Sequence, residues 1–125
     1  MTAHGDILAV LEDYSRGIYE GNVERLRSAF HPTAVLWGEV RGAPYHRALD
    51  DYLTVVKGRQ SPQALGEQFA MQPLSIDVQG PIALAKVSSP MLGFNYVDLL
   101  SLLYQDGKWK IVAKVFTHVE VRENG

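Results

Sequence analysis

The residue that most suggests chemistry is Asp98, a carboxylate in the otherwise apolar segment YVDLLSLLYQ at residues 96–105. A run of Leu, Val and Tyr of this length is typical of a β-strand. Burying a carboxylate among apolar side chains is costly unless it is hydrogen-bonded or neutral. Asp98 is therefore either a structural anchor or part of a binding pocket, where its neutral form could donate a hydrogen bond to a ligand oxygen.

The segment that follows predicts what lies beside Asp98. Asp106-Gly107 is typical of a two-residue type I′ turn, so residues 96–121 predict a long antiparallel hairpin. The turn pairs Gln105 with Lys108, and every earlier pair keeps the same residue sum. One face then carries the pairs Tyr104/Trp109, Leu102/Ile111, Leu100/Ala113, Asp98/Val115 and Tyr96/Thr117. We expect Val115 and Thr117 to line a pocket with Asp98, and Val112, Phe116 and His118 to lie on the opposite face.

Tyr14 is the second candidate, on an amphipathic helix predicted from about residue 6 to 20. The apolar stripe of this helix consists of Ile7, Leu11, Tyr14 and Ile18, with Asp6 as the expected N-cap and Gly21 just beyond the C-terminus. A tyrosine on such a stripe is ordinarily a core residue whose hydroxyl finds a partner. Its hydroxyl is also a donor that could act together with Asp98 on one ligand oxygen.

The remaining elements must position these two residues. Asn22 predicts the cap of a second, short helix that ends at His31-Pro32, and AVLWGEV at 34–40 predicts a strand in which Gly38 allows a close approach. A loop at 41–47, a third helix ending at Gly58 and two strands near 74–78 and 82–89 follow. Helices that precede a run of long strands indicate an α+β fold with the helices on one face of an antiparallel sheet.

Composition bounds the class of protein. A chain of 125 residues with no cysteine and a net charge of −2 predicts one domain, 1–125, without disulfides. Because Lys and Arg are spread along the chain, we expect no nucleic-acid partner. No apolar run approaches a membrane span, and no signal peptide is evident, so a cytoplasmic protein is the default expectation. The four histidines lack metal-binding spacing, and no dinucleotide, nucleophile-elbow or Walker motif predicts a cofactor.

Several segments together resemble a known superfamily. YEGNVERLRSAFHPTAVLWGEVRG and LLSLLYQDGKWKIVAKVF, of which FHP-A and DGKWKI are the most specific parts, are similar to the nuclear transport factor 2-like superfamily and within it to its lumazine-binding branch. The resemblance covers nearly the whole chain. It implies a cystatin-like α+β cone, in which three N-terminal helices close a strongly curved antiparallel sheet around a pocket. It also implies a homodimer through the outer sheet face, with Val112, Phe116 and His118 near the contact.

The superfamily also includes SnoaL-like polyketide cyclases and ketosteroid isomerases. In the isomerases a tyrosine and a protonated aspartic acid stabilise an enolate while a second aspartate moves the proton. Tyr14 and Asp98 match the first two positions. The position of the base falls near Gly38, and the nearest carboxylate, Glu39, should point to the other side. His46, predicted in a loop, is a weak substitute for the base or an ordinary solvated histidine.

Three interpretations of function remain open. The first is a pocket that binds a flat, carbonyl-bearing organic molecule, and the second is a cofactor-free isomerase, cyclase or dehydratase that uses Tyr14 and Asp98. The third is a dimeric accessory module without a ligand. A cone with several aromatic residues suits a flat ligand, although such residues are more often part of a core. The expected ligand-binding side chains are Trp37, His46, Tyr52, Phe94, Tyr96, Val115 and Thr117.

Overall fold

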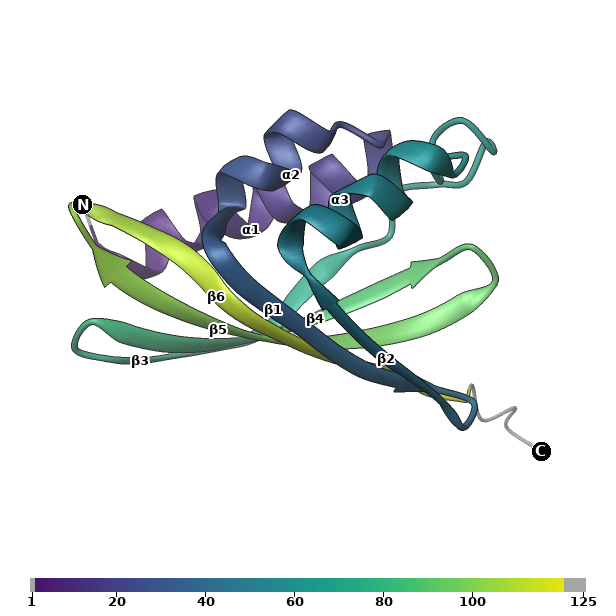
Figure 1. Ribbon diagram of the computed structural model, residues 1–125. Coiled ribbons are helices and arrows are strands. Elements are labelled where there is room, and N and C mark those ends of the chain that lie inside the picture. The colour runs from purple at the N-terminus through teal and green to yellow at the C-terminus, as the bar shows by residue number, and fades with distance from the viewer. Residues whose placement is uncertain (1, 121–125) are drawn as a thin grey trace.

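The computed structural model describes residues 2–120 and contains three helices and six strands in an α+β arrangement (Figure 1). The helices are α1 (Ala3–Glu20), α2 (Val23–Ala29) and α3 (Leu49–Gly58). The strands are β1 (Phe30–Val40), β2 (Ala43–Ala48), β3 (Gln72–Gln79), β4 (Ile82–Met91), β5 (Phe94–Gln105) and β6 (Lys108–His118). Val121, the end of the predicted hairpin segment, lies outside the described residues.

The strands form one curved, unclosed sheet in the order β2-β1-β6-β5-β4-β3. All pairs are antiparallel except β1 with β6, which are parallel. Figure 1 shows the three helices on one side of this sheet, and we call the opposite side the outer face. The predicted fold class is therefore confirmed. No helix in residues 2–120 is long and apolar enough to cross a membrane.

The first two helices begin and end largely where local chemistry predicts. Thr2, not Asp6, caps α1, because its hydroxyl accepts a hydrogen bond from the Gly5 amide at 3.1 Å. Gly21 ends α1 with a left-handed φ of 69°. Asn22 caps α2 as expected by accepting from the Arg25 amide at 3.1 Å. The tight link places the two helices side by side.

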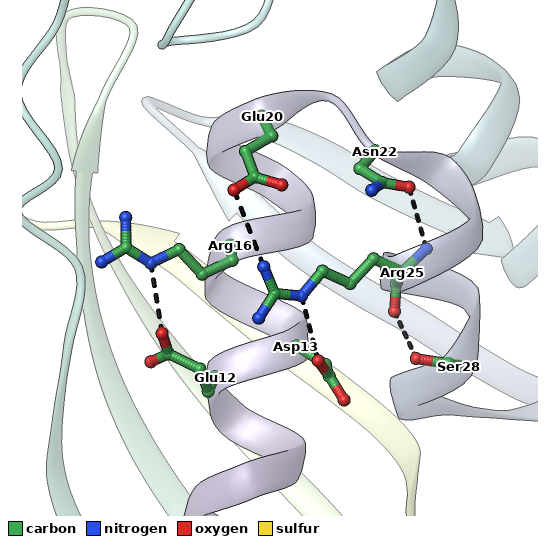
Figure 2. Close-up of polar contacts among 7 residues, drawn as sticks. All are labelled: Glu12, Asp13, Arg16, Glu20, Asn22, Arg25 and Ser28. Carbon is green, nitrogen blue, oxygen red and sulfur yellow. Dashed lines mark hydrogen bonds and ion pairs between the residues drawn. The ribbon is translucent and has the colours of Figure 1, made fainter.

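Polar contacts fix α2 against α1 (Figure 2). The Arg25 guanidinium lies 3.0 Å from Asp13 and 3.6 Å from Glu20, both on α1. Gly17 permits the close packing, since a Cβ at that position would lie 2.8 Å from the Leu26 backbone. The three helices together bury apolar side chains against the sheet, among them Ile7, Leu11, Ile18, Leu26, Leu53 and Val56.

Two predicted boundaries near β1 are wrong. The strand begins at Phe30, so His31-Pro32 lies inside β1 and does not merely end a helix. Most of the residues expected in the loop at 41–47 instead lie in β2, which runs from Ala43 to Ala48. The loop prediction failed because residues 41 and 42 form a tight turn between β1 and β2, in which Arg41 has φ 51° and Gly42 has φ 85°. An arginine seldom adopts that conformation, and the turn was therefore not evident from the sequence.

The long hairpin forms, but its predicted register is wrong beyond Leu102. Pairs from Gln105/Lys108 to Leu102/Ile111 are as expected, after which Ser101 pairs with Ala113 and Asp98 with Phe116. Val112 is thus the extra residue of a β-bulge. Because side chains alternate, one extra residue exchanges the two faces of the rest of β6. Lys114, Phe116 and His118 consequently face the helices, whereas Val115 and Thr117 face outward.

Candidate functional site

A cavity of about 150 Å³ lies between α3 and the part of β6 that follows the bulge at Val112. Its deepest residues, Tyr52, Asp98 and Lys114, are at most 4% exposed. The other residues that line it are partly exposed and mostly apolar or aromatic: Val40, Tyr45, Val55, Arg59, Met91, Tyr96 and Phe116. The cavity therefore combines an apolar, aromatic entrance with a polar, charged floor, as small-molecule sites commonly do.

Asp98 is held by two hydroxyl groups at the base of the cavity. The Tyr14 hydroxyl donates to its Oδ2 at 2.6 Å, and the Ser89 hydroxyl donates to the same oxygen at 2.8 Å. The other oxygen, Oδ1, is buried and has no hydrogen-bond partner among the described residues. Asp98 thus acts as an acceptor on one side and offers an unpaired oxygen on the other.

Tyr14 is fully buried beneath Asp98 and does not line the cavity. Burial raises the pKa of Tyr14 well above the usual value for tyrosine, and the nearby Asp98 charge and their hydrogen bond raise it further. Its hydroxyl therefore stays protonated and keeps donating to Asp98. Tyr14 and Asp98 are brought together as the sequence suggested, but the tyrosine orients the aspartate instead of donating beside it to a ligand.

Lys114 places a buried cation next to this pair. Its Nζ lies 3.5 Å from the Tyr52 hydroxyl and about 5 Å from three ring centroids, those of Tyr14, Tyr52 and Phe116. Burial alone lowers the pKa of Lys114, but interactions with Tyr52 and with the Asp98 charge outweigh it, so the pKa is raised. With its pKa raised, Lys114 keeps its positive charge next to Asp98.

Arg59 supplies a second cation at the cavity wall, directly after α3. Its Nη2 atom is buried and, like Asp98 Oδ1, has no hydrogen-bond partner among residues 2–120. Arg59 lines the same cavity as Asp98, Lys114 and Tyr96. Two residues that line the cavity thus each have one buried polar atom without a partner.

Of the seven side chains predicted to bind a ligand, Tyr52 and Tyr96 line the cavity. Burial raises the pKa of Tyr96, so its hydroxyl is protonated at neutral pH. Phe94 is set back from the cavity, where its ring stacks on Tyr96 at 5.3 Å. Phe94 is therefore a support for the cavity wall.

Four predicted ligand-binding residues lie away from the cavity on the outer face, and these predictions are corrected. Trp37 is 51% exposed and stacks on His46 at 3.7 Å, in the strand pair β1-β2. Val115 is 49% exposed, and the exposed Thr117 donates to the Glu39 carbonyl at 2.8 Å. His46 therefore lies in a strand on the wrong face to serve as a base.

The inward side chains of Phe116 and His118 correct the predicted dimer contact. Phe116 lines the cavity, and the His118 ring, 4% exposed, accepts from the Asn95 amide through Nδ1 at 2.9 Å. Gly38 makes room for Phe116, since a Cβ there would lie 2.7 Å from its ring. Val112 remains on the outer side, in a shallow groove with Ile82, Leu84 and Leu103.

Sequence reasoning missed three residues of this site: Ser89, Arg59 and Lys114. Ser89 follows a small, apolar segment and pairs across β4-β5 with Tyr96, two register positions from Asp98. Arg59 directly follows a helix, where basic residues are common. The register expected from the turn would place Lys114 on the face opposite Asp98, and the bulge at Val112 turns it inward. Among residues 2–120, no group of His, Asp or Glu is arranged to hold a metal ion.

The comparisons with known proteins agree with this architecture. Residues 2–117 match the family described as "Putative lumazine-binding". The chain belongs to this family. A nuclear transport factor 2-like protein of unknown function from Methylobacillus flagellatus is 27% identical with a TM-score of 0.84, over 96% of both chains. One from Shewanella baltica is 22% identical with a TM-score of 0.82, over 97% of this chain and 99% of the other.

A curated relative carries the name of an enzyme. Aldolase FrzH from Cladobotryum sp is 24% identical over 110 residues, which cover 88% of this chain and 86% of that protein. Membership of the lumazine-binding-like family and likeness to nuclear transport factor 2-like structures together indicate a ligand-binding fold.

Proposed function

We propose that this protein binds a small, flat, carbonyl-bearing organic molecule in the cavity between α3 and the sheet. The observation that carries the proposal is the pair of buried atoms without partners, Asp98 Oδ1 and Arg59 Nη2, which belong to residues of the same cavity. Buried polar atoms in native proteins are nearly always hydrogen-bonded. A ligand with one donor and one carbonyl acceptor would complete both bonds.

The size of the cavity favours a ligand with one ring. A dry cavity of roughly 150 Å³ is known to hold benzene, whereas drug-sized ligands occupy roughly 300 Å³ or more. The entrance residues Tyr45, Tyr96 and Phe116 present their rings at steep angles to one another, 73° for Tyr45 with Phe116 and 71° for Tyr96 with Phe116. Aromatic walls in this arrangement enclose a flat ring better than a branched molecule.

Nuclear magnetic resonance titration of the labelled protein tests this proposal, with benzamide, which has an N–H donor and a carbonyl acceptor, as the probe. We expect amide shift changes concentrated around the cavity, and a loss of affinity in Asp98→Asn and Arg59→Gln. Lys57→Gln is the matched control, because Lys57 is an exposed cation in the last turn of α3. If Asp98→Asn and Arg59→Gln bind the probe as strongly as Lys57→Gln does, or if the shift changes are confined to the outer face, the ligand binds elsewhere.

A second candidate function is cofactor-free chemistry through an enolate, and the free Oδ1 of Asp98 favours it. A carboxylate with one unpaired oxygen in a cavity can act as a general base. In this scheme Asp98 Oδ1 takes the proton from a carbon next to a carbonyl group, and the electron pair of the broken C–H bond forms the enolate. Lys114 and Arg59 would stabilise the enolate oxygen. The relative named as an aldolase supports this candidate, because aldol chemistry also proceeds through a carbanion next to a carbonyl group.

Deuterium exchange separates the second candidate from simple binding. Acetophenone in heavy water should exchange its methyl protons faster with the protein than without it, and Asp98→Asn should abolish the acceleration. The Lys57→Gln variant should exchange at the wild-type rate. An exchange rate equal to the buffer background would leave ligand binding as the function.

A further inference from the structure

The charges around the cavity do not balance. Arg59 and Lys114 contribute two cations, and Asp98 contributes one carboxylate. Neither Arg59 nor Lys114 forms a salt bridge within residues 2–120. With all three groups ionised, the wall and floor of the cavity carry one positive charge in excess.

Burial makes this excess charge costly in the absence of a ligand. Lys114 is only 4% exposed, and its amine donates to the Tyr52 hydroxyl at 3.5 Å, a long hydrogen bond. Arg59 Nη2 is buried without a partner. A buried cation is stabilised by a paired anion together with hydrogen bonds. Among the described residues, neither Arg59 nor Lys114 has a paired anion, and one nitrogen of Arg59 also lacks a hydrogen bond.

Asp98 cannot neutralise both cations, because it carries a single negative charge. Its Oδ2 is occupied by the hydroxyl groups of Tyr14 and Ser89 at 2.6 and 2.8 Å. Only Oδ1 remains, and it has no donor from the protein. The site therefore offers cationic donors to one part of a ligand and a carboxylate acceptor to another part.

We propose that the cavity selects a small organic anion with one charge, a one-ring acid whose carboxylate or enolate oxygens bind Arg59 and Lys114 and whose hydroxyl or N–H group donates to Asp98 Oδ1. This inference rests on the proposed binding function and specifies its ligand class. Hydrogen bonds between ionised groups are about twice as strong as those between neutral groups, so the selection should favour an anion over a neutral molecule of equal shape.

A matched pair of probes tests the charge preference. Benzoate and benzamide have nearly the same shape, but only benzoate carries a charge. We expect isothermal titration of the wild-type chain to give at least about tenfold tighter binding of benzoate, and meta-hydroxybenzoate to bind more tightly still through Asp98. Arg59→Gln and Lys114→Met should each remove most of the preference, while Lys57→Gln should keep it.

The possible results separate this inference from the binding proposal. Equal or tighter binding of benzamide in the wild type would overturn the preference for anions and leave the binding proposal standing. Failure of all three probes to bind would overturn both. Because Lys114 is buried, circular dichroism should first show that Lys114→Met is folded, and the partly exposed Arg59→Gln variant decides the question if it is not.

Discussion

Replacing Tyr14 by Phe removes one of the two hydrogen bonds that hold Asp98. The side chain is fully buried, and the lost hydroxyl donates to Asp98 Oδ2 at 2.6 Å. Phe fills the same space apart from the oxygen atom, so packing changes little. Asp98 would then keep only the Ser89 hydroxyl as a donor.

The expected loss follows from the charge of the acceptor. A hydrogen bond to a charged group contributes about 1.5–3 kcal/mol, and we expect Tyr14→Phe to lower the free energy of unfolding by about 2 kcal/mol at neutral pH. Tyr19→Phe is the matched control, because the Tyr19 hydroxyl donates at the same 2.6 Å distance to an uncharged acceptor, the Glu67 carbonyl. A loss of only about 1 kcal/mol is expected there.

Urea unfolding at several pH values measures both variants. Because the pKa of Tyr14 is raised in the folded protein, its stabilising contribution is fully present below the unfolded pKa of about 10 and is lost as the pH rises towards the folded value. The difference in stability between wild type and Tyr14→Phe should therefore shrink above about pH 10. A loss no larger than that of Tyr19→Phe, or one that does not change at alkaline pH, would refute the role of Tyr14 in holding Asp98.

Three further results are expected. Gly38→Ala should destabilise the fold by about 1–3 kcal/mol in thermal unfolding, because its Cβ would lie 2.7 Å from the ring and the carbonyl oxygen of Phe116. Gly58→Ala is the control, because a Cβ at that position meets open space. Equal stability of the two variants would contradict that packing. Asp98→Asn should lower the pKa of Lys114 in a carbon-detected NMR titration, because burial lowers that pKa and the opposing Asp98 charge is gone; an unchanged pKa would show that Asp98 does not act on Lys114. We also propose a homodimer through the outer face, so sedimentation should give a dimer that Val115→Lys dissociates; a wild-type monomer at micromolar concentration would rule it out.

The dimer proposal rests on a surface that the sequence only partly located. Leu84, Leu99 and Val115 are each between 38% and 49% exposed on the outer face, where Figure 1 shows no covering helix. The predicted contact residues Phe116 and His118 were displaced from this surface by a single extra residue in β6. A turn motif determines the register of its two strands only as far as the first bulge. The residue types around Val112 do not predict a bulge there.

The parts of the fold that the sequence predicted are those with strong local signals. The spacing of Ile7, Leu11, Tyr14 and Ile18 predicted α1, and Asn22 and Gly21 predicted the link to α2. The turn at Asp106-Gly107 was also evident. The β1-β2 turn escaped prediction because Arg41 adopts a positive φ that is unusual for its type.

The candidate site was half predictable. A carboxylate in an apolar strand and a tyrosine on a buried stripe identified Asp98 and Tyr14, which the structure joins at 2.6 Å. Their partners were not predictable, because Lys114 depends on the bulge and Arg59 approaches the cavity from the end of a different element. Contacts between distant segments carry no local pattern.

A crystal structure of the protein with meta-hydroxybenzoate tests the central claim most directly, namely that a ligand completes the bonds of Asp98 and Arg59. The account predicts the ring between Tyr45, Tyr96 and Phe116. It also predicts a carboxylate oxygen within about 2.7–3.2 Å of Arg59 Nη2 and the hydroxyl at a similar distance from Asp98 Oδ1. An occupied site elsewhere, or a cavity in which ordered waters bind both atoms while saturating ligand stays in solution, would contradict it.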